Sequence, residues 1–479
     1  MKFLRKLLGR GDAEAPLSGS FELDKVFNST AVPPLTFIDR SPDQPSIRQI
    51  RNALLMSGQI VCIHGPSKSG KTTFVRRLAN EEGADCVLIK GTDVNDLNSF
   101  WIAVGEALKV KVEQTTLTSE KDALTQSKGA RVGASLSSGL AALKAQASIE
   151  ETKSLEATSV VHHASLQSVK TAVLEALEKH QSWILVDDFH MACTSAQENA
   201  SPEDSQRKRH RIFDDLKGIV GDEGVHFIFT SIPREPIDPV GGGGQKVVDA
   251  QLGQRVSVFE FPAWNTAELS QIPELGFKLL GLEGQPGIFE RIGKAALGSP
   301  LNVHKICATI CLNLGARRTV PPDERPRSVT LETVRAAIGD FIRSQEIYAG
   351  YVEDLLSVDL ASGSARVNFR NREISLNELI LMALAKSHIH QEFGLKISNL
   401  RNRMKHVARA HRWSSDAIVR RLKVMSDITI TLTLSSNAEF ARKHQPIIFD
   451  NAANKVFLVD PGLAMYLDEM FKADLAWLR

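Results

Sequence analysis

The sequence has few cysteines, no long hydrophobic run and almost no net charge, and each shortage excludes a class of protein. Its five cysteines are scattered and contain no CxxC pair, which argues against a disulfide framework or a zinc site and favours buried thiols in a reducing compartment. No apolar run reaches the roughly 18–20 residues that a membrane-spanning helix needs. We therefore expect a cytoplasmic protein with no membrane partner. A net charge of +2 does not identify a partner, so local charge clusters must do so.

The composition is that of an ordinary globular protein, with 43% hydrophobic and 24% charged residues. A chain of 479 residues predicts two to four domains, at about 100–200 residues each. Residues 1–24 form an N-terminal segment and linker. Within it, Met1 to Arg10 alternates apolar pairs with basic residues, which favours a docking or frayed helix over a weak surface anchor.

Short apolar runs alternate with helical patterns over residues 25–265. This alternation predicts an α/β fold, with a five-stranded parallel sheet and helices on both faces. Residues 111–160 are rich in Ser, Ala, Thr and Gly and lack aromatics, so we interpret them as an insertion without an assigned function. The expected strands are Gln59–His64, Cys86–Ile89, Trp183–Val186, Val225–Phe229 and Val256–Phe261.

From Thr266 onward the pattern is mainly helical, and we assign residues 266–370 to a helical lid with connecting helices. Residues 371–479 show three helices followed by two β-rich runs, Ile428–Leu434 and Pro446–Val459. Three helices followed by a hairpin is the order of a winged helix, so a C-terminal winged-helix domain is predicted.

One segment fits the pattern G-x-x-x-x-G-K-[ST] and lies between an expected strand and an expected helix, the context that the phosphate-binding P-loop requires. Its glycines let backbone N–H groups surround a phosphate, and the following helix directs its positive end at the anion. Lys71 would lie against the β- and γ-phosphates, and the Thr72 hydroxyl would bind Mg²⁺. The chain is thus predicted to be a P-loop NTPase that binds Mg-ATP or ADP. The predicted nucleotide-binding residues here are Gly65, Pro66, Ser67, Lys68, Ser69, Gly70, Lys71, Thr72 and Thr73.

A second element of the site is the pair Asp187-Asp188, which follows four apolar residues at the end of an expected strand. Asp187 is predicted to hold magnesium through water. Asp188 stands where many such ATPases have a glutamate that orients the attacking water, and its shorter side chain predicts slow hydrolysis. The alternative is that one Asp only caps the following turn. Thr230 or Ser231, at the end of the next strand, would sense the γ-phosphate, unless Ser231 simply begins a turn before Pro233.

Together these residues resemble the AAA+/STAND group of additional-strand P-loop ATPases. The segment Phe37-Ile38-Asp39-Arg40 is similar to the hydrophobic-Gly-Arg element that touches adenine in these families, with Asp39 in place of the glycine. Gly298-Ser299-Pro300-Leu301 resembles the nucleotide-contacting motif of the STAND/NB-ARC lid, and Leu301 stands where many AAA+ lids have a sensor arginine. The resemblance therefore implies that Arg40 and Pro300 contact nucleotide. The alternative for Pro300 is that it simply forms part of a helical turn.

Arg255 directly precedes the fifth expected strand, where related oligomeric ATPases have an arginine that reaches the neighbouring subunit's γ-phosphate. The resemblance makes Arg255 the first candidate for this finger and Arg234 the second. The alternative is an arginine that is solvated or paired within its own chain.

Basic residues gather in the expected winged helix. Between Lys396 and Met425 there are nine Lys and Arg residues against one acid, Asp416. A basic recognition helix of this kind would enter the major groove of double-stranded DNA, with an affinity that falls as salt rises. STAND proteins instead use the same fold to hold the ATPase module closed. The segment Phe457–Pro461 resembles the one that closes the winged helix of bacterial STAND ATPases, although a turn capped by Asp460 explains it equally well.

Three functions follow from this pattern. The first is a slow ATPase switch that changes conformation or oligomerises with nucleotide state, acting as a homo-oligomer or on a partner effector, which family habit associates with bacterial defence or signalling. The second is a DNA-binding ATPase of the origin-recognition or transposition-helper type, using residues 396–425. The third is a scaffold that carries a structural nucleotide.

Overall fold

The computed structural model describes three stretches of the chain, and the insertion 111–160, residues 1–10 and Arg234 lie outside them. It divides into two compact units. Unit 2 contains residues 48–64 and 71–260, whereas unit 1 contains residues up to 47, residues 65–70 and residues 261–479. The described residues are 20–110 without 29–34, 41–43 and 57; 169–232 without 178, 180–181, 194–201 and 221–224; and 255–475 without 322, 324–326, 345, 362–365, 370–371, 386–393, 408–412, 429, 434–440, 445 and 452–453.

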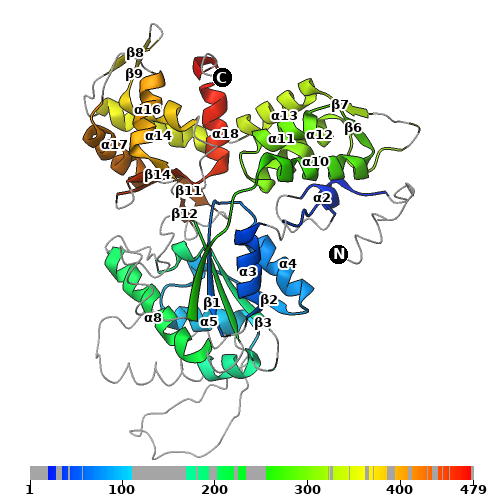
Figure 1. The fold of residues 1–479 in the computed structure, drawn as a ribbon, viewed down its shortest axis with the longest axis vertical. Coiled ribbons are helices and arrows are strands. Elements are labelled where there is room, and N and C mark those ends of the chain that lie inside the picture. The colour runs from blue at the N-terminus through cyan, green and yellow to red at the C-terminus, as the bar shows by residue number, and fades with distance from the viewer. Residues whose placement is uncertain are drawn as a thin grey trace, which may run out of the picture. The chain divides into compact units, whose positions relative to one another are not determined.

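Unit 2 is built on a five-stranded sheet in the order β2-β3-β4-β1-β5, and every pairing in it is parallel (Figure 1). This confirms the predicted P-loop NTPase α/β fold. Strand β4 lies between β1 and β3, although it follows both in the chain. Because these three strands are parallel, their C-terminal ends meet at one edge of the sheet. The strands are β1 (Ile60–His64), β2 (Asp85–Lys90), β3 (Ser182–Asp187), β4 (His226–Ser231) and β5 (Val256–Glu260).

The helices of unit 2 cover this sheet. Residues 169–177 are also helical. The centre of the sheet is apolar because β1 is buried over its whole length and β3 is buried up to Asp187. Aromatic side chains fill the space above it, with Phe213 and Phe229 centroids 4.8 Å apart. The helices are α3 (Pro45–Leu55), α4 (Lys71–Glu81), α5 (Leu97–Ala107) and α8 (Pro202–Val220), with short 3₁₀ turns η1 (Gly91–Asp93) and η2 (Phe189–Met191).

Unit 1 contains a helical group that follows β5 in the chain. Capping explains its boundaries: Asn265 and Thr330 form capping boxes at the starts of α10 and α13, and Ser299 caps α12 ahead of Pro300. Phe27 packs on Phe277 of α10 and adds the N-terminal segment to this core. The elements are α2 (Leu23–Val26), α10 (Thr266–Leu280), α11 (Ile288–Ala295), α12 (Pro300–Asn313), α13 (Leu331–Arg343) and the strands β6 (Leu282–Gly284) and β7 (Arg327–Val329).

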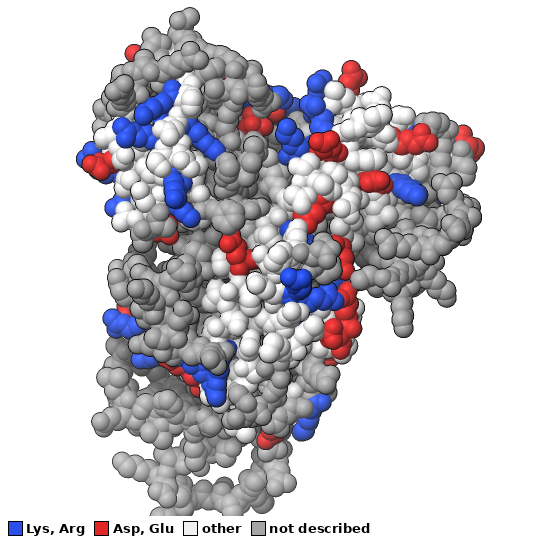
Figure 2. Space-filling view, in the orientation of Figure 1, with Lys and Arg blue, Asp and Glu red and all other residues white. Residues whose placement is uncertain are grey.

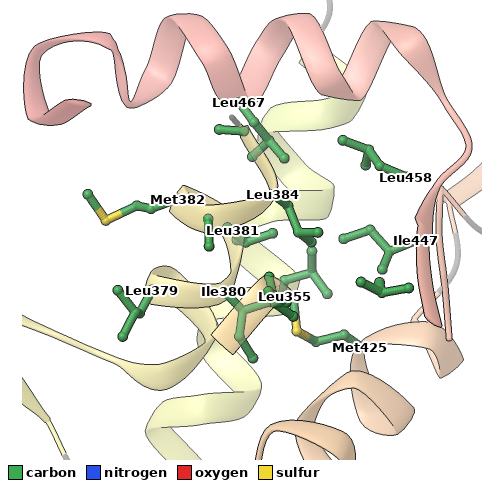
Figure 3. Packing of buried hydrophobic residues seen from close by; sticks show 14 of the residues in the cluster. Leu355, Leu379, Ile380, Leu381, Met382, Leu384, Met425, Ile447, Leu458 and Leu467 are labelled. Atoms are coloured by element: carbon green, nitrogen blue, oxygen red, sulfur yellow. The ribbon is translucent and has the colours of Figure 1, made fainter. Parts of the chain in front are cut away.

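The C-terminal part of unit 1 has its own apolar core, to which α14 and the helices after it contribute (Figure 3). Leu379, Ile380 and Leu381 of α15 are all buried, so this helix is covered on several sides. The helices are α14 (Glu346–Ala361), α15 (Leu376–Ala385), α16 (Ile397–Val407), α17 (Ser415–Asp427), α18 (Pro461–Met470) and α19 (Lys472–Leu475). The strands are β8 (Val367–Phe369), β9 (Arg372–Ile374), β10 (Leu395–Lys396), β11 (Ile430–Thr433), β12 (Ala441–His444), β13 (Ile447–Asp450) and β14 (Lys455–Leu458).

At two places the structure adds detail that the sequence pattern did not resolve. Helix α8 begins at Pro202, a residue suited to the first turn of a helix. The single β-rich run over 446–459 is two antiparallel strands, β13 and β14, because the chain turns at Asn454 with a φ of 52°. Among the described residues, no helix combines the length and apolarity needed to span a bilayer. The five cysteines are free thiols, and four of them are buried.

Candidate functional site

The phosphate-binding loop begins where β1 ends, and its backbone needs the glycines that the motif provides. A Cβ on Gly65 would lie 2.7 Å from the carbonyl oxygen of Phe261, which is closer than real contacts allow. Gly70 has a φ of 90°, a conformation that favours glycine. Lys68 also has a positive φ, 59°, so the loop is sharply turned at this residue.

The segment that follows β5 and the start of α12 both bond this loop. Trp264 donates its indole N–H to the carbonyl oxygen of Ser69 at 2.7 Å. Ser299 is fully buried and donates its hydroxyl to the carbonyl oxygen of Lys68 at 3.4 Å, while it also caps α12. The ring of Pro300 lies 3.9 Å from where a side chain on Gly70 would begin. The segment that sequence reasoning placed near the nucleotide therefore lies against the P-loop.

Lys71 begins α4 in unit 2 and is buried. Burial lowers its pKa from 10.5 to about 8, and the negative charges of Asp188 and Asp187 partly oppose that shift. His64, the last residue of β1, has its pKa lowered to about 4 by burial and by the positive charge of Lys71. His64 is thus neutral at physiological pH, and Lys71 is the cation at this position.

Thr72, Asp187 and Thr230 meet at the C-terminal edge of the sheet. The Thr72 hydroxyl donates to Asp187 Oδ1 at 2.7 Å, and the Thr230 hydroxyl donates to the same oxygen. Thr230 is fully buried, whereas Ser231 is partly exposed. These contacts arise because β3 and β4 are neighbours and end at the same level of the sheet. Of the two hydroxyls that the sequence offered as sensors, Thr230 is the one engaged with the aspartate.

Asp188 adopts a left-handed conformation, with φ 53° and ψ 44°. Its backbone N–H donates to the Thr230 hydroxyl at 3.3 Å. Its carbonyl oxygen lies so close to Gly91 that a Cβ there would collide with it. The chain therefore turns sharply after Asp187 and fixes the backbone of the residue predicted to orient water.

Arg40, predicted to touch adenine, is buried against the segment that joins β5 to α10. Its guanidinium donates to the carbonyl oxygens of Pro262 and Ala263 and lies 3.4 Å from a carboxylate oxygen of Glu268. It also stacks 4.8 Å from the ring centroid of Trp264. These contacts show that Arg40 holds Trp264 and the start of α10, while its contact with a base stays a prediction.

Arg255 is exposed and donates to the carbonyl oxygen of Lys217, near the C-terminal end of α8, at 2.5 Å. This is the paired state that the sequence left as the alternative. An arginine that bonds a helix C-terminus is also well placed electrostatically. A role of Arg255 at a neighbouring subunit stays a prediction, and Arg234 lies outside the described residues.

One pair of residues at the loop was not predicted from the sequence. Lys68 Nζ lies 3.0 Å from Oδ1 and 3.2 Å from Oδ2 of Asp460, the residue that caps α18. Tyr348 of α14 lies 3.4 Å from the same ammonium. The Asp460-Pro461 dipeptide indicated a helix start, but nothing local to it indicated a partner almost four hundred residues away.

The donor set fits a magnesium nucleotide. Thr72 and Asp187 offer the oxygen ligands that Mg²⁺ prefers. Lys71 supplies a desolvated cation, and the start of α4 presents backbone N–H groups to an anion. The buried Ser69 hydroxyl has no hydrogen-bond partner among the described residues, as expected of a group that serves a phosphate oxygen.

The chain was compared with protein families and with solved structures. The family model described as "AAA domain" matches residues 54–234. Similar solved structures include the Walker-type ATPase of Pyrococcus abyssi, with 12% identity over 90% of this chain and 96% of that chain and a TM-score of 0.47. Cdc6p of Pyrobaculum aerophilum has 13% identity, 94% and 98% coverage and a TM-score of 0.36. Drosophila ORC bound to DNA has 12% identity, 97% and 98% coverage and a TM-score of 0.35.

No curated protein sequence matches the chain. At these TM-scores the similar structures do not bear on function. The family match covers β1, the P-loop, Asp187 and Thr230, which are the parts on which the site geometry rests. Residues 54–234 therefore form an AAA+ P-loop ATPase domain.

Proposed function

We propose that this protein is a slow Mg-ATPase that works as a conformational switch. The observation that carries the proposal is the pair of hydrogen bonds that the P-loop backbone receives from later parts of the chain. Trp264 donates to the carbonyl oxygen of Ser69, and Ser299 donates to that of Lys68. These bonds link the conformation of the loop, and so the state of a nucleotide bound to it, to the helices that follow β5.

The residues of unit 2 supply the chemistry. Lys71 neutralises charge on the phosphates, and Thr72 with Asp187 would hold the magnesium ion, which polarises the phosphate when bound. Thr230 fixes the carboxylate of Asp187, and Asp188 orients the attacking water from a backbone held by Thr230 and Gly91. The short Asp188 side chain supports slow ATP hydrolysis. A slow rate suits a switch that stays in its ATP-bound state for some time, and it does not suit a motor that turns over ATP continuously.

The residues of unit 1 supply the response. Trp264 and Ser299 bond two consecutive carbonyl groups of the P-loop, at Ser69 and Lys68. A change in the loop backbone on exchange of ATP for ADP therefore alters hydrogen bonds of the lid directly. On this proposal the output is a change of conformation or of oligomeric state, with a partner effector as the target in a bacterial defence or signalling system.

The switch can be tested by measuring the size of the protein with each nucleotide bound. The purified protein would be passed over a sizing column with light scattering in ADP and in a non-hydrolysable ATP analogue, each with Mg²⁺. We expect a different mass or hydrodynamic radius in the two nucleotides, and no difference for Lys71→Ala, which cannot hold phosphate. An unchanged mass and radius in both states, with nucleotide bound, would exclude the switch and leave the scaffold.

Arg255 is the candidate finger at a neighbouring subunit. Arg255→Ala should therefore lose only the part of the ATP hydrolysis that depends on oligomers.

A second function, binding of double-stranded DNA, is favoured by the surface of α16 and α17. Lys and Arg side chains gather where these helices lie (Figure 2). Arg420 and Lys423 of α17 are exposed. Phosphate oxygens form charge-assisted hydrogen bonds with exposed ammonium and guanidinium groups of this kind.

Titration of a labelled duplex at two salt concentrations tests this function. We expect Arg420→Ala with Lys423→Ala to weaken binding and to reduce its salt dependence by about two charges. The matched control is Lys278→Ala with Lys294→Ala, which removes two exposed lysines from the lid helices α10 and α11. Absence of binding at low salt, or equal losses in the two double variants, would exclude α17 as a DNA-reading helix.

A further inference from the structure

Asp460 connects the P-loop to two helices of the C-terminal part of unit 1. Its carboxylate accepts from the backbone N–H of Gly462 at 2.8 Å, which caps α18. The same group receives the Lys68 ammonium at 3.0 Å and hydrogen-bonds the Tyr348 hydroxyl of α14. The packing here is close, because a Cβ on Gly462 would lie 2.5 Å from the Tyr348 oxygen.

Burial makes this ion pair different from an ordinary surface pair. The Asp460 side chain is 5% exposed and that of Lys68 is 31% exposed. A half-desolvated pair of this kind is more costly to break than an exposed one. Burial and the negative charge of Asp460 also raise the pKa of Tyr348, so the phenol remains a hydrogen-bond donor.

Asp460 also interacts electrostatically with a second cation. Burial and the charge of Lys68 lower the pKa of Lys305 on α12, and the charge of Asp460 opposes this effect. One carboxylate therefore favours the charged forms of Lys68, with which it is paired, and of Lys305. The terminal phosphate of a nucleotide carries more negative charge than one carboxylate and binds ammonium groups through strong charge-assisted hydrogen bonds.

We propose that Asp460 is an internal competitor of the nucleotide's terminal phosphate for Lys68. A nucleoside triphosphate displaces the carboxylate from Lys68 and releases the start of α18, whereas a diphosphate leaves the Lys68–Asp460 pair in place. This inference rests on the proposed switch and names the contact through which the P-loop would control the C-terminal helices.

Asp460→Asn is the decisive variant, because asparagine caps a helix as well as aspartate does and only the charge is lost. We expect the Kd for a non-hydrolysable ATP analogue to fall about tenfold, and the Kd for ADP to change by less than about twofold. Calorimetric titration with Mg²⁺ measures both. The control Glu469→Gln removes an exposed ion pair with Lys472 on the same helix and should change neither value.

A double-mutant cycle isolates the contact. Lys68→Gln removes the other partner, so adding Asp460→Asn to it should have no further effect on the affinity for the ATP analogue. Wild-type protein provides a test without substitutions: hydrogen exchange over residues 456–468 should be faster with the ATP analogue than with ADP.

The outcomes separate this inference from the proposed switch. If wild type binds no nucleotide, the ATPase and the competition both fail. If wild type binds both nucleotides, the competition alone is overturned by any of three results: an Asp460→Asn affinity within twofold of wild type, an effect that persists in Lys68→Gln, or equal exchange over 456–468 in both nucleotides.

Discussion

The two halves of the P-loop differ in how their partners are reached. Lys71 and Thr72 lie beside Asp187 because strands of one sheet bring their ends together. Each of these residues belongs to a local motif that the sequence shows. Lys68 and Ser69 meet Asp460, Ser299 and Trp264, which lie about two hundred to four hundred residues further along the chain. The first half follows from the chemistry of phosphate binding. The second half ties that chemistry to other helices, which is where control can act.

The largest expected effect concerns the first half. Asp187→Ala removes the carboxylate that accepts from both Thr72 and Thr230. We expect the ATPase rate to fall by about 100-fold to 1,000-fold, because a group that organises charge in the transition state is lost. Nucleotide binding should be largely retained through Lys71. Phosphate release measures the rate, and a normal rate in this variant would remove Asp187 from the site.

Gly65→Ala tests the junction between the halves. The added Cβ would meet the carbonyl oxygen and Cβ of Phe261 at 2.7 and 3.0 Å, so backbone atoms must move. We expect a loss of about 1–3 kcal/mol in the free energy of unfolding and weaker nucleotide binding. The control is Gly218→Ala, where a Cβ meets nothing within 4 Å, and alanine should stabilise α8 slightly. Urea unfolding of both variants measures the difference, and equal stabilities would contradict the predicted clash.

The acidity of Lys71 gives a pH dependence of the first half. With its pKa near 8, the lysine loses its proton as pH rises through 8, and the attraction for phosphate is lost with it. We expect the affinity for ADP to weaken by about tenfold from pH 7 to pH 9, since about a tenth of the lysine remains charged at pH 9. Titrations across this range measure the change.

A direct sign of the same effect is proton uptake. Bound phosphate favours the charged lysine, so binding near pH 8 should take up protons, which calorimetry in buffers of different ionisation enthalpy detects. Binding that is independent of both pH and buffer would mean that Lys71 is fully protonated throughout. The same pKa shift affects stability. Because the pKa of Lys71 in the folded protein is below the ordinary 10.5, the contribution of Lys71 to the free energy of unfolding increases as pH rises from 8 to 10.5.

The smallest effect compares two serine caps. Ser299 caps α12 and also donates to the Lys68 carbonyl, whereas Ser414 caps α17 without touching the P-loop. Replacing either serine by alanine should cost about 1 kcal/mol of stability. Only Ser299→Ala should also weaken nucleotide binding, by about twofold to fivefold. Equal affinities in the two variants would show that the contact of the lid with the P-loop is not coupled to the nucleotide.

The sheet and half of the site were predictable for a physical reason. Buried parallel strands give short apolar runs, and a phosphate loop tolerates few residue types, so β1, Gly65–Thr72 and Asp187 are visible locally. Thr230 was one of two candidates because a strand end exposes alternate side chains. Only the register of β4 beside β3 places Thr230, and not Ser231, on the aspartate.

The contacts of the second half were not predictable in the same way. Arg40 was expected at adenine, but its fit to the carbonyls of Pro262 and Ala263 depends on how the N-terminal segment packs on the lid. Trp264 had no motif at all, since one tryptophan in a connecting segment has many possible partners. Lys68 was assigned to phosphate because of its place in the motif, and its pairing with Asp460 required the complete fold of unit 1.

By itself, the sequence determined a P-loop motif and a parallel sheet to carry it, and it predicted a pair of magnesium ligands, because each depends on residue types at fixed local spacing. The tertiary structure alone decided which distant groups act on that loop. A hydrogen bond or ion pair forms wherever folding brings a donor and an acceptor within reach, and neither Trp264 nor Asp460 carries a local sign of the residue it will meet.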